Sequence, residues 1–99
     1  MLVDKSIKEN SGMKKMYFPS NNSLEESVIE TLHELGGLSS VTQINCKVIE
    51  ILELPEEVVK LEDESGIGTK LNYRLRWSRT NLKNRGLIKN EGRGMWRLL

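Results

Sequence analysis

At 99 residues the chain has room for one small domain, and 37% hydrophobic with 29% charged residues is typical of a soluble globular protein. Its formal net charge is only +1, but positive and negative residues are distributed very unevenly along the chain. Residues 70–99 carry nine Lys and Arg against one acid, whereas residues 23–69 carry eleven acids against two lysines. Such a basic end predicts a surface for nucleic acid or for another acidic partner.

Rare residue types exclude several kinds of chemistry. The chain has one cysteine, Cys46, and one histidine, His33, so neither an internal disulfide nor a Cys/His zinc site can form within it. No Ser–His or Cys–His catalytic arrangement is indicated. We therefore expect a protein that is not an enzyme and that holds no metal or cofactor.

Targeting signals are not indicated by the sequence. No apolar run approaches the roughly 18 residues of a membrane span. The N-terminus also lacks the apolar segment of a secretory signal. We expect a cytoplasmic protein without a membrane partner, and nothing in the sequence indicates an oligomeric state.

The N-terminal region differs in composition from the rest. Residues 1–16 show no sustained periodicity and are rich in Lys, Ser and Asn, which predicts a flexible tail. Met13 and Met16 are candidate alternative starts. The single domain is expected to span residues 17–99.

The first predicted helix covers residues 24–35. Ser23 and Glu26 have the spacing of a capping box at its start, and Gly36-Gly37 can end it in the left-handed conformation. Its apolar residues recur at helical spacing along one stripe. The stripe consists of Leu24, Val28, Ile29, Leu32 and Leu35.

Two further helices are predicted before the basic region. Ser40 and Gln43 repeat the capping-box spacing and predict a helix from residue 41 to about 53. Pro55 is suited to the first position of a short third helix with two glutamates in its first turn. The acidic, glycine-containing residues 62–70 are expected to form a connecting loop.

A basic helix is predicted over residues 71–85, closed by Gly86. At about 100° per residue it has three faces. The apolar face, expected to pack on the first two helices, consists of Leu71, Leu75, Ser78 and Leu82. The outward polar face consists of Asn72, Arg76, Arg79 and Lys83. A third strip consists of Tyr73, Trp77 and Thr80.

A β-hairpin is predicted over residues 87–98, with its turn in the glycine-containing segment 90–94. Alternation places Trp96 and Leu98 on one side of its second strand. The order helix, helix, short helix, basic helix and hairpin predicts a mainly α fold with a small β-hairpin. This is a winged helix-turn-helix of three to four helices plus a two-stranded wing.

The C-terminal residues also resemble a family, the N-terminal domain of Mrr-type restriction proteins. The resemblance covers roughly residues 17–98, including two helices separated by glycines and the later run Leu-Pro-Glu-Glu. The most specific part of the resemblance is a sequence motif. It begins with an Arg and, three residues later, a Trp that is followed directly by a small residue. A Leu, the pair Gly-Leu and finally Arg-Gly-x-Trp come after these. Here these are Arg74, Trp77, Ser78, Leu82, Gly86-Leu87 and Arg93-Gly94-Met95-Trp96.

The resemblance implies a winged-helix DNA-binding domain, usually fused to a nuclease domain of the PD-(D/E)xK class, in a family associated with modified DNA. Because the chain ends at the wing, the nuclease is expected to act from a separate domain or subunit, in cis or in trans. Arg76 stands where the family often has a small residue, and Ser78 where it often has Ala. The additional arginine favours DNA binding.

Double-stranded DNA is therefore the expected partner. The second helix of a helix-turn-helix enters the major groove, where Arg pairs with guanine and Asn with adenine. Residues expected to reach base edges are Asn72, Arg76, Arg79 and Thr80, and Tyr73 is also expected to contact the DNA. Residues expected to contact phosphates are Lys70, Lys83, Lys89 and Arg93.

The sequence is also compatible with other roles for these residues. The basic helix can serve as a docking or dimerisation surface for an acidic protein, with no nucleic-acid contact. Arg74 and Arg85 are expected to pair with the acidic helices. Trp77 and Trp96 can stack on bases, but in so small a domain both are expected to be core anchors.

Overall fold

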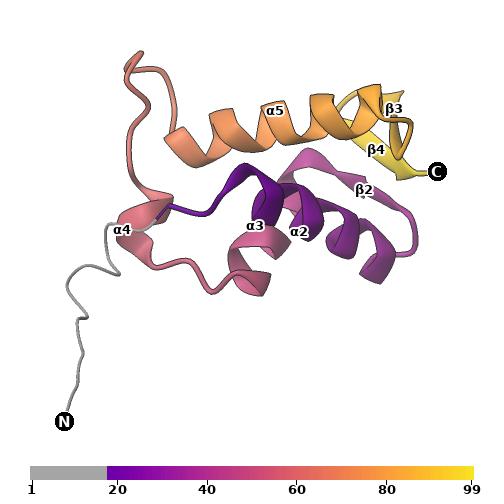
Figure 1. The fold of residues 1–99 in the computed structure, drawn as a ribbon, viewed down its shortest axis with the longest axis horizontal. Coiled ribbons are helices and arrows are strands. Elements are labelled where there is room, and N and C mark those ends of the chain that lie inside the picture. Colours follow the sequence, from indigo (N-terminus) through magenta and orange to yellow (C-terminus); the bar gives the residue numbers. More distant parts are fainter. Residues whose placement is uncertain (1–17) are drawn as a thin grey trace, which may run out of the picture.

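The computed structural model describes residues 18–99, which contain four helices and three strands, and the helices and the hairpin follow the predicted order (Figure 1). The predicted tail over residues 1–16, with its candidate starts Met13 and Met16, lies outside the described residues. The elements are α2 (Asn21–Glu34), β2 (Leu38–Ser40), α3 (Val41–Ile51), α4 (Glu56–Val59), α5 (Lys70–Asn84), β3 (Ile88–Gly92) and β4 (Met95–Leu98).

Helix α2 begins three residues before its predicted start. Ser20, not Ser23, is the N-cap, and its Oγ accepts a hydrogen bond from the Ser23 amide at 3.1 Å. The predicted capping box of Ser23 and Glu26 is therefore wrong. Two serines three residues apart both satisfy the cap pattern, and the earlier one wins because it extends the helix by most of a turn.

The start of α3 is confirmed. The Ser40 hydroxyl accepts from the Gln43 amide at 3.1 Å, and the Gln43 side-chain oxygen accepts from the Ser40 amide at 3.0 Å. This reciprocal pair is a complete capping box. In α4, Pro55 is the N-cap in extended geometry rather than the first helical residue, so this start was placed one residue early.

Substituting Ser40 tests the cap of α3. Ser40→Ala removes the acceptor of the Gln43 amide, and we expect the free energy of unfolding to fall by about 1 kcal/mol. Urea denaturation measures this change, with the exposed Thr42→Ala in the same helix as control. Equal stability of the two variants would contradict a stabilising cap at Ser40.

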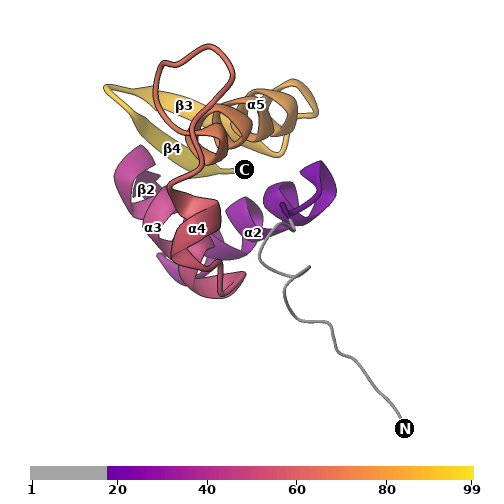
Figure 2. The same cartoon turned by 90° about the vertical axis from the view of Figure 1, so that its left-hand side faces the viewer.

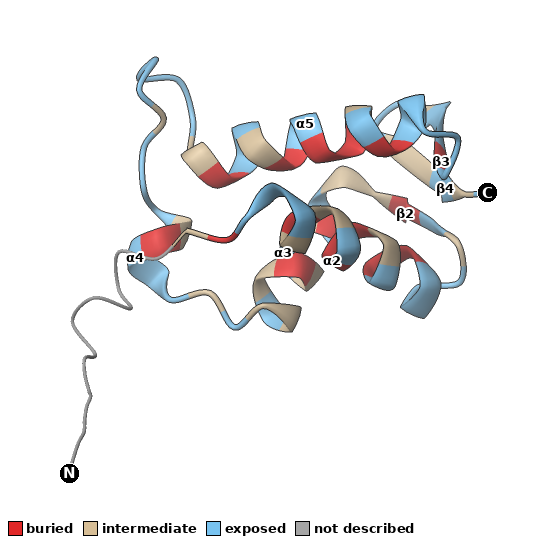
Figure 3. Cartoon of the chain, in the orientation of Figure 1, coloured by how far each residue is buried: buried red, intermediate tan, exposed pale blue. Residues whose placement is uncertain are grey.

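The core lies where α2, α3 and α5 meet, and the buried sides of these helices face one another (Figure 3). Viewed from its end, the domain has α5 and the hairpin on one side and α2, α3 and α4 on the other (Figure 2). The predicted apolar faces are confirmed except at Leu35, which is the C-cap of α2 and is 39% exposed. The central buried residues are Leu24, Val28, Leu32, Ile44, Val48, Leu71, Leu75, Leu82 and Ile88.

A third strand, β2, joins the predicted hairpin and was not predicted. It pairs antiparallel with β4, so the sheet order is β2-β4-β3, and Ser39 lies opposite Trp96. The hairpin turns at Arg93 and Gly94, both at positive φ, after a bulge at Asn90/Gly92. Strand β2 ties the hairpin to the helices. The mainly α fold with a small antiparallel sheet is confirmed and is compatible with a winged helix-turn-helix.

Candidate nucleic-acid interface

Helix α5 packs along one side on the core and leaves the opposite side open to solvent (Figure 3). The Thr69 hydroxyl caps its start by accepting from the Asn72 amide at 3.2 Å. Gly86, at φ +78°, allows the chain to turn away after its end. Of 15 residues, five are Lys or Arg and none is Asp or Glu. The predicted apolar face is buried as a whole.

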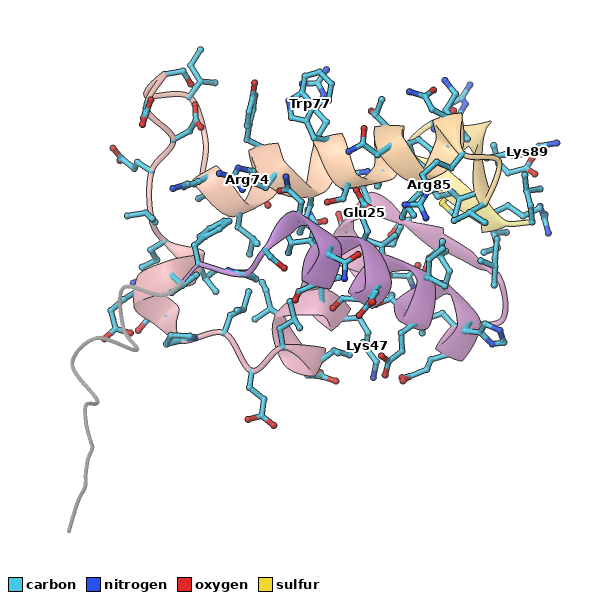
Figure 4. All side chains as sticks on the ribbon, viewed as in Figure 1. Glu25, Lys47, Arg74, Trp77, Arg85 and Lys89 are labelled. Carbon is cyan, nitrogen blue, oxygen red and sulfur yellow. The ribbon has the colours of Figure 1, made fainter. Side chains whose placement is uncertain are left out.

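Two aromatic side chains stand on the solvent side of α5. Tyr73 is 48% exposed and Trp77 51% exposed, and their rings meet edge to face with centroids 6.4 Å apart. Figure 4 shows Trp77 pointing away from the other helices. The pair lines a surface pocket of about 360 Å³ together with Arg76 and Thr80.

The prediction of Trp77 as a core anchor is therefore wrong. The buried side of α5 is filled by its leucines, and Trp77 belongs to the strip that points away from them. Trp96 differs, because it is partly buried and packs against the core from β4, as predicted. Exposed Trp and Tyr side by side are typical of an interaction surface.

Arg79 was predicted on the outward face but is buried, with only 7% of its surface exposed. Its Nη1 donates to the Asn45 side-chain oxygen at 3.3 Å, and its guanidinium carbon lies 6.0 Å from the centroid of the Trp96 ring. Burial, and then the like charge of Arg76, lower the pKa of Arg79. Arg79 is the member of its predicted face closest to the apolar face, where α3 and β4 cover it.

Asn45 on α3 connects the buried arginine to the exposed start of α5. Its amide nitrogen donates to the Asn72 side-chain oxygen at 3.3 Å, while its oxygen accepts from Arg79. Asn45 was not among the predicted site residues. A helical wheel of α5 alone cannot find it, because its role depends on how α3 crosses α5.

Lys70 lies on the flank of α5 that faces α2, away from Arg76. Its Nζ is 5.0 Å from the centroid of the Phe18 ring, and the Arg74 guanidinium is 5.4 Å from the same centroid. Arg74 also donates to the Asn21 side-chain oxygen at 3.1 Å. Lys70 therefore does not join the other candidates, and Arg74 pairs with an amide and a ring rather than with an acid.

Arg85 does form the expected ion pair with an acidic helix. Its Nη1 lies 2.9 Å from a carboxylate oxygen of Glu25 on α2, and the two side chains face each other in Figure 4. Arg85 is largely exposed, so this pair contributes at most about 1 kcal/mol. The pair holds the acidic helix against the C-terminal end of α5.

The wing carries three basic side chains around one acid. Arg97 donates through Nε to Glu91 at 2.7 Å, and Lys89 Nζ lies 3.8 Å from the same carboxylate. The hydrogen bond from Arg97, followed by the charges of Lys89 and Arg97, lowers the pKa of Glu91. Arg93 is exposed at the turn. The carboxylate therefore offsets part of the positive charge that the sequence places on the wing.

Comparison with known protein families shows to which family the chain belongs. The Mrr N-terminal domain matches residues 22–98. The chain belongs to this family. No curated protein and no solved structure matches the chain.

The resemblance motif of the Mrr N-terminal domain divides between core and surface in this chain. Ser78 and Leu82 are buried, and the Ser78 hydroxyl donates to the Arg74 carbonyl at 3.0 Å. Gly86 occupies a positive-φ turn, and Trp96 packs on the core. Trp77 alone among these lies on the open side of α5. The motif therefore holds the basic helix in place and also contributes to its exposed surface.

Over residues 18–99 there is no group of three or more His, Cys, Asp and Glu side chains placed to hold a metal ion. No helix in that range is long and apolar enough to cross a membrane.

Proposed function

We propose that this Mrr N-terminal domain binds double-stranded DNA, with α5 in the major groove and the β3–β4 wing beside it. In this role it is the targeting module of a restriction-type system, and a nuclease domain or subunit acts on the DNA that it selects. The observation that supports the proposal is the open side of α5, where polar, basic and aromatic side chains gather without any acid.

The dimensions and residue types of α5 fit the major groove. Fifteen residues make a helix of about 22 Å, and the groove, about 12 Å wide, admits one helix. Arg76 can donate to guanine, and Asn72 can pair with adenine. Tyr73, Trp77 and Thr80 offer apolar and hydroxyl contacts to base edges, including the thymine methyl.

Phosphate contacts are proposed for the basic residues that flank this surface. Lys83 lies near the end of α5, Lys89 on β3, and Arg93 at the wing turn, all exposed. Lys70, on the opposite flank, can reach a phosphate only beyond the edge of the groove. The acids of α2, α3 and α4 lie on the other half of the chain, and this polarity orients the domain as it approaches DNA.

A titration of duplex DNA tests the function. Fluorescence anisotropy of a labelled duplex should show binding to the wild-type protein, and Trp77→Ala or Arg76→Ala should each weaken it about tenfold. The matched control is Lys47→Ala, because Lys47 lies across the domain from Trp77 and pairs with Glu34 and Glu50 (Figure 4). Modified and unmodified duplexes tested in parallel show which of the two is preferred.

If the control lost as much affinity for DNA as the two α5 variants, the exposed side of α5 would not be the DNA-binding surface. No binding of the wild-type protein to any duplex at low salt would refute the function itself.

The alternative function is a protein-interaction module, and the exposed Tyr73–Trp77 pair also supports it. Aromatic side chains at the centre of an exposed patch are typical anchors of protein interfaces. The two functions differ in NMR spectra recorded at low salt. Added duplex should shift the amides of residues 70–97 if DNA is the partner, and spectra that stay unchanged favour the protein-interaction module.

A further inference from the structure

Arg79 is a buried cation without a counter-ion among the described residues. Its hydrogen-bond partner is the neutral amide of Asn45, and its Nε is buried with no partner. The nearby charge of Arg76 has the same sign. A neutral amide and an aromatic ring 6.0 Å away compensate poorly for the lost hydration of a guanidinium. An arrangement of this kind is typical of a site that receives its negative charge from a ligand.

A pocket of about 300 Å³ opens beside this arginine. Its walls come from α3, from the loop before α5 and from the first turns of α5, and no Asp or Glu lines it. Arg76 and Arg79 supply positive charge, while Asn45, Asn72 and the Thr69 hydroxyl supply uncharged polar groups. The N-terminal end of α5, with its positive dipole, adds to this field.

We propose that this pocket, the Arg79 pocket, holds one backbone phosphate of the bound DNA, and that this phosphate is the counter-ion of Arg79. The inference rests on the proposed function, because it takes the phosphate from a duplex lying along α5. A phosphodiester carries one negative charge and free oxygens that accept charge-assisted hydrogen bonds from guanidinium groups. Inorganic phosphate shares this chemistry and serves as the small probe.

The consequence for recognition is that Arg79 positions the helix and does not read a base. A phosphate bound at the junction of α3 and α5 fixes the depth and register of α5 in the groove. Asn45 transmits this contact, since the same side chain bonds Arg79 and the exposed Asn72. Base reading is thereby left to the side chains on the open side of α5.

A carboxylate placed inside the pocket tests the proposal. Asn45→Asp is isosteric and puts a negative charge where the amide oxygen now lies 3.3 Å from Arg79. Asn72 is exposed and can turn its amide to donate to the new group. An internal counter-ion should raise the melting temperature and exclude the phosphate. A variant that is more stable yet binds DNA less well is not expected from a purely structural arginine.

Two measurements provide the readout. Thermal unfolding in phosphate and in chloride at matched ionic strength should show that phosphate raises the melting temperature of the wild type but not of Asn45→Asp. Anisotropy titrations of duplex DNA over a range of salt should show about tenfold weaker binding by Asn45→Asp, with a salt slope smaller by about one.

Control variants separate charge from hydrogen bonding. Asn45→Ala removes the hydrogen bond without adding charge and should lower the melting temperature while keeping its dependence on phosphate. Gln43→Glu adds the same charge to α3 within a capping box that tolerates it, and should also keep that dependence. Arg79→Gln, which removes the cation, should lose both the phosphate effect and one unit of salt slope.

The outcomes are distinguishable. Wild-type affinity and slope in Asn45→Asp would overturn the Arg79 pocket while leaving DNA binding intact. A different result is that phosphate stabilises the wild type but the salt slope of DNA binding is the same in Asn45→Asp. The pocket would then be a site for free anions, and the proposal that it holds a phosphate of the DNA backbone would be overturned. A wild-type protein that binds no duplex at all would overturn the proposed function and this inference together.

Discussion

Leu75→Ala should lower the free energy of unfolding by about 2–5 kcal/mol, the range for a leucine truncated in a packed core. Leu75 is fully buried at the middle of α5, in the cluster that joins this helix to α2 and α3. For a domain of this size, such a loss lowers the melting temperature by more than about 8 °C. Circular dichroism melts and urea titrations measure it.

Trp77→Ala is the matched comparison, because it lies two residues further along the same helix and removes a larger side chain. With half of its surface exposed, its loss should cost about 1 kcal/mol or less. A Trp77→Ala protein as unstable as Leu75→Ala would return Trp77 to the core. The reverse ranking is expected for DNA affinity, provided that Leu75→Ala is assayed below its melting temperature.

Local signals in the sequence predicted much of the fold. The helical spacing of Leu71, Leu75 and Leu82 marks the buried side of α5, because a 3.6-residue period leaves one face for the core. The Ser40–Gln43 capping box could be predicted because it is also a local signal: all of its atoms lie within four consecutive residues. At the start of α2 the local signal was misleading, because Ser23 and Glu26 have the spacing of a capping box although the N-cap is Ser20.

Strand β2 could not be predicted in this way. Three residues, Leu38–Ser40, form a strand because β4 lies beside them, almost sixty positions later in the chain. Their own composition, one Leu and two Ser, has no strand preference that would reveal it. A strand of this kind depends on tertiary pairing.

The candidate site was predicted less well than the fold, and the reason is specific. The helical wheel placed Trp77 away from the apolar face, but the general preference of Trp for the core was given more weight. The same wheel assigned Arg79 to the outward face, although it is the member of that face nearest the apolar side, where α3 and β4 cover it. Asn45 was missed because its partners lie on another helix.

The affinity for duplex DNA should fall about 150- to 500-fold between about 50 and 200 mM salt, as expected for four to five phosphate contacts. The cations that make up this number are on α5 and the wing. Lys47 and Lys60 are not among them, because Lys47 already pairs with Glu34 and Glu50, and Lys60 with Glu56. If the affinity hardly changed with salt concentration, the protein would bind DNA without contacting its phosphates.

Glu91→Gln distinguishes a wing that contacts DNA from a surface that attracts DNA only through its net charge. Glu91 is the only acid of residues 70–99. It accepts a hydrogen bond from Arg97 and forms a longer ion pair with Lys89. A glutamate is ionised at neutral pH, and the hydrogen bond from Arg97 lowers the pKa of Glu91 further, so its negative charge offsets the wing under binding conditions. Removing that charge should free a cation for phosphate, steepen the salt slope by about one and tighten binding at low salt. The same titration repeated with Glu57→Gln, an exposed acid on α4, should show neither change. If both variants tighten binding equally, net charge governs affinity and the wing does not touch DNA.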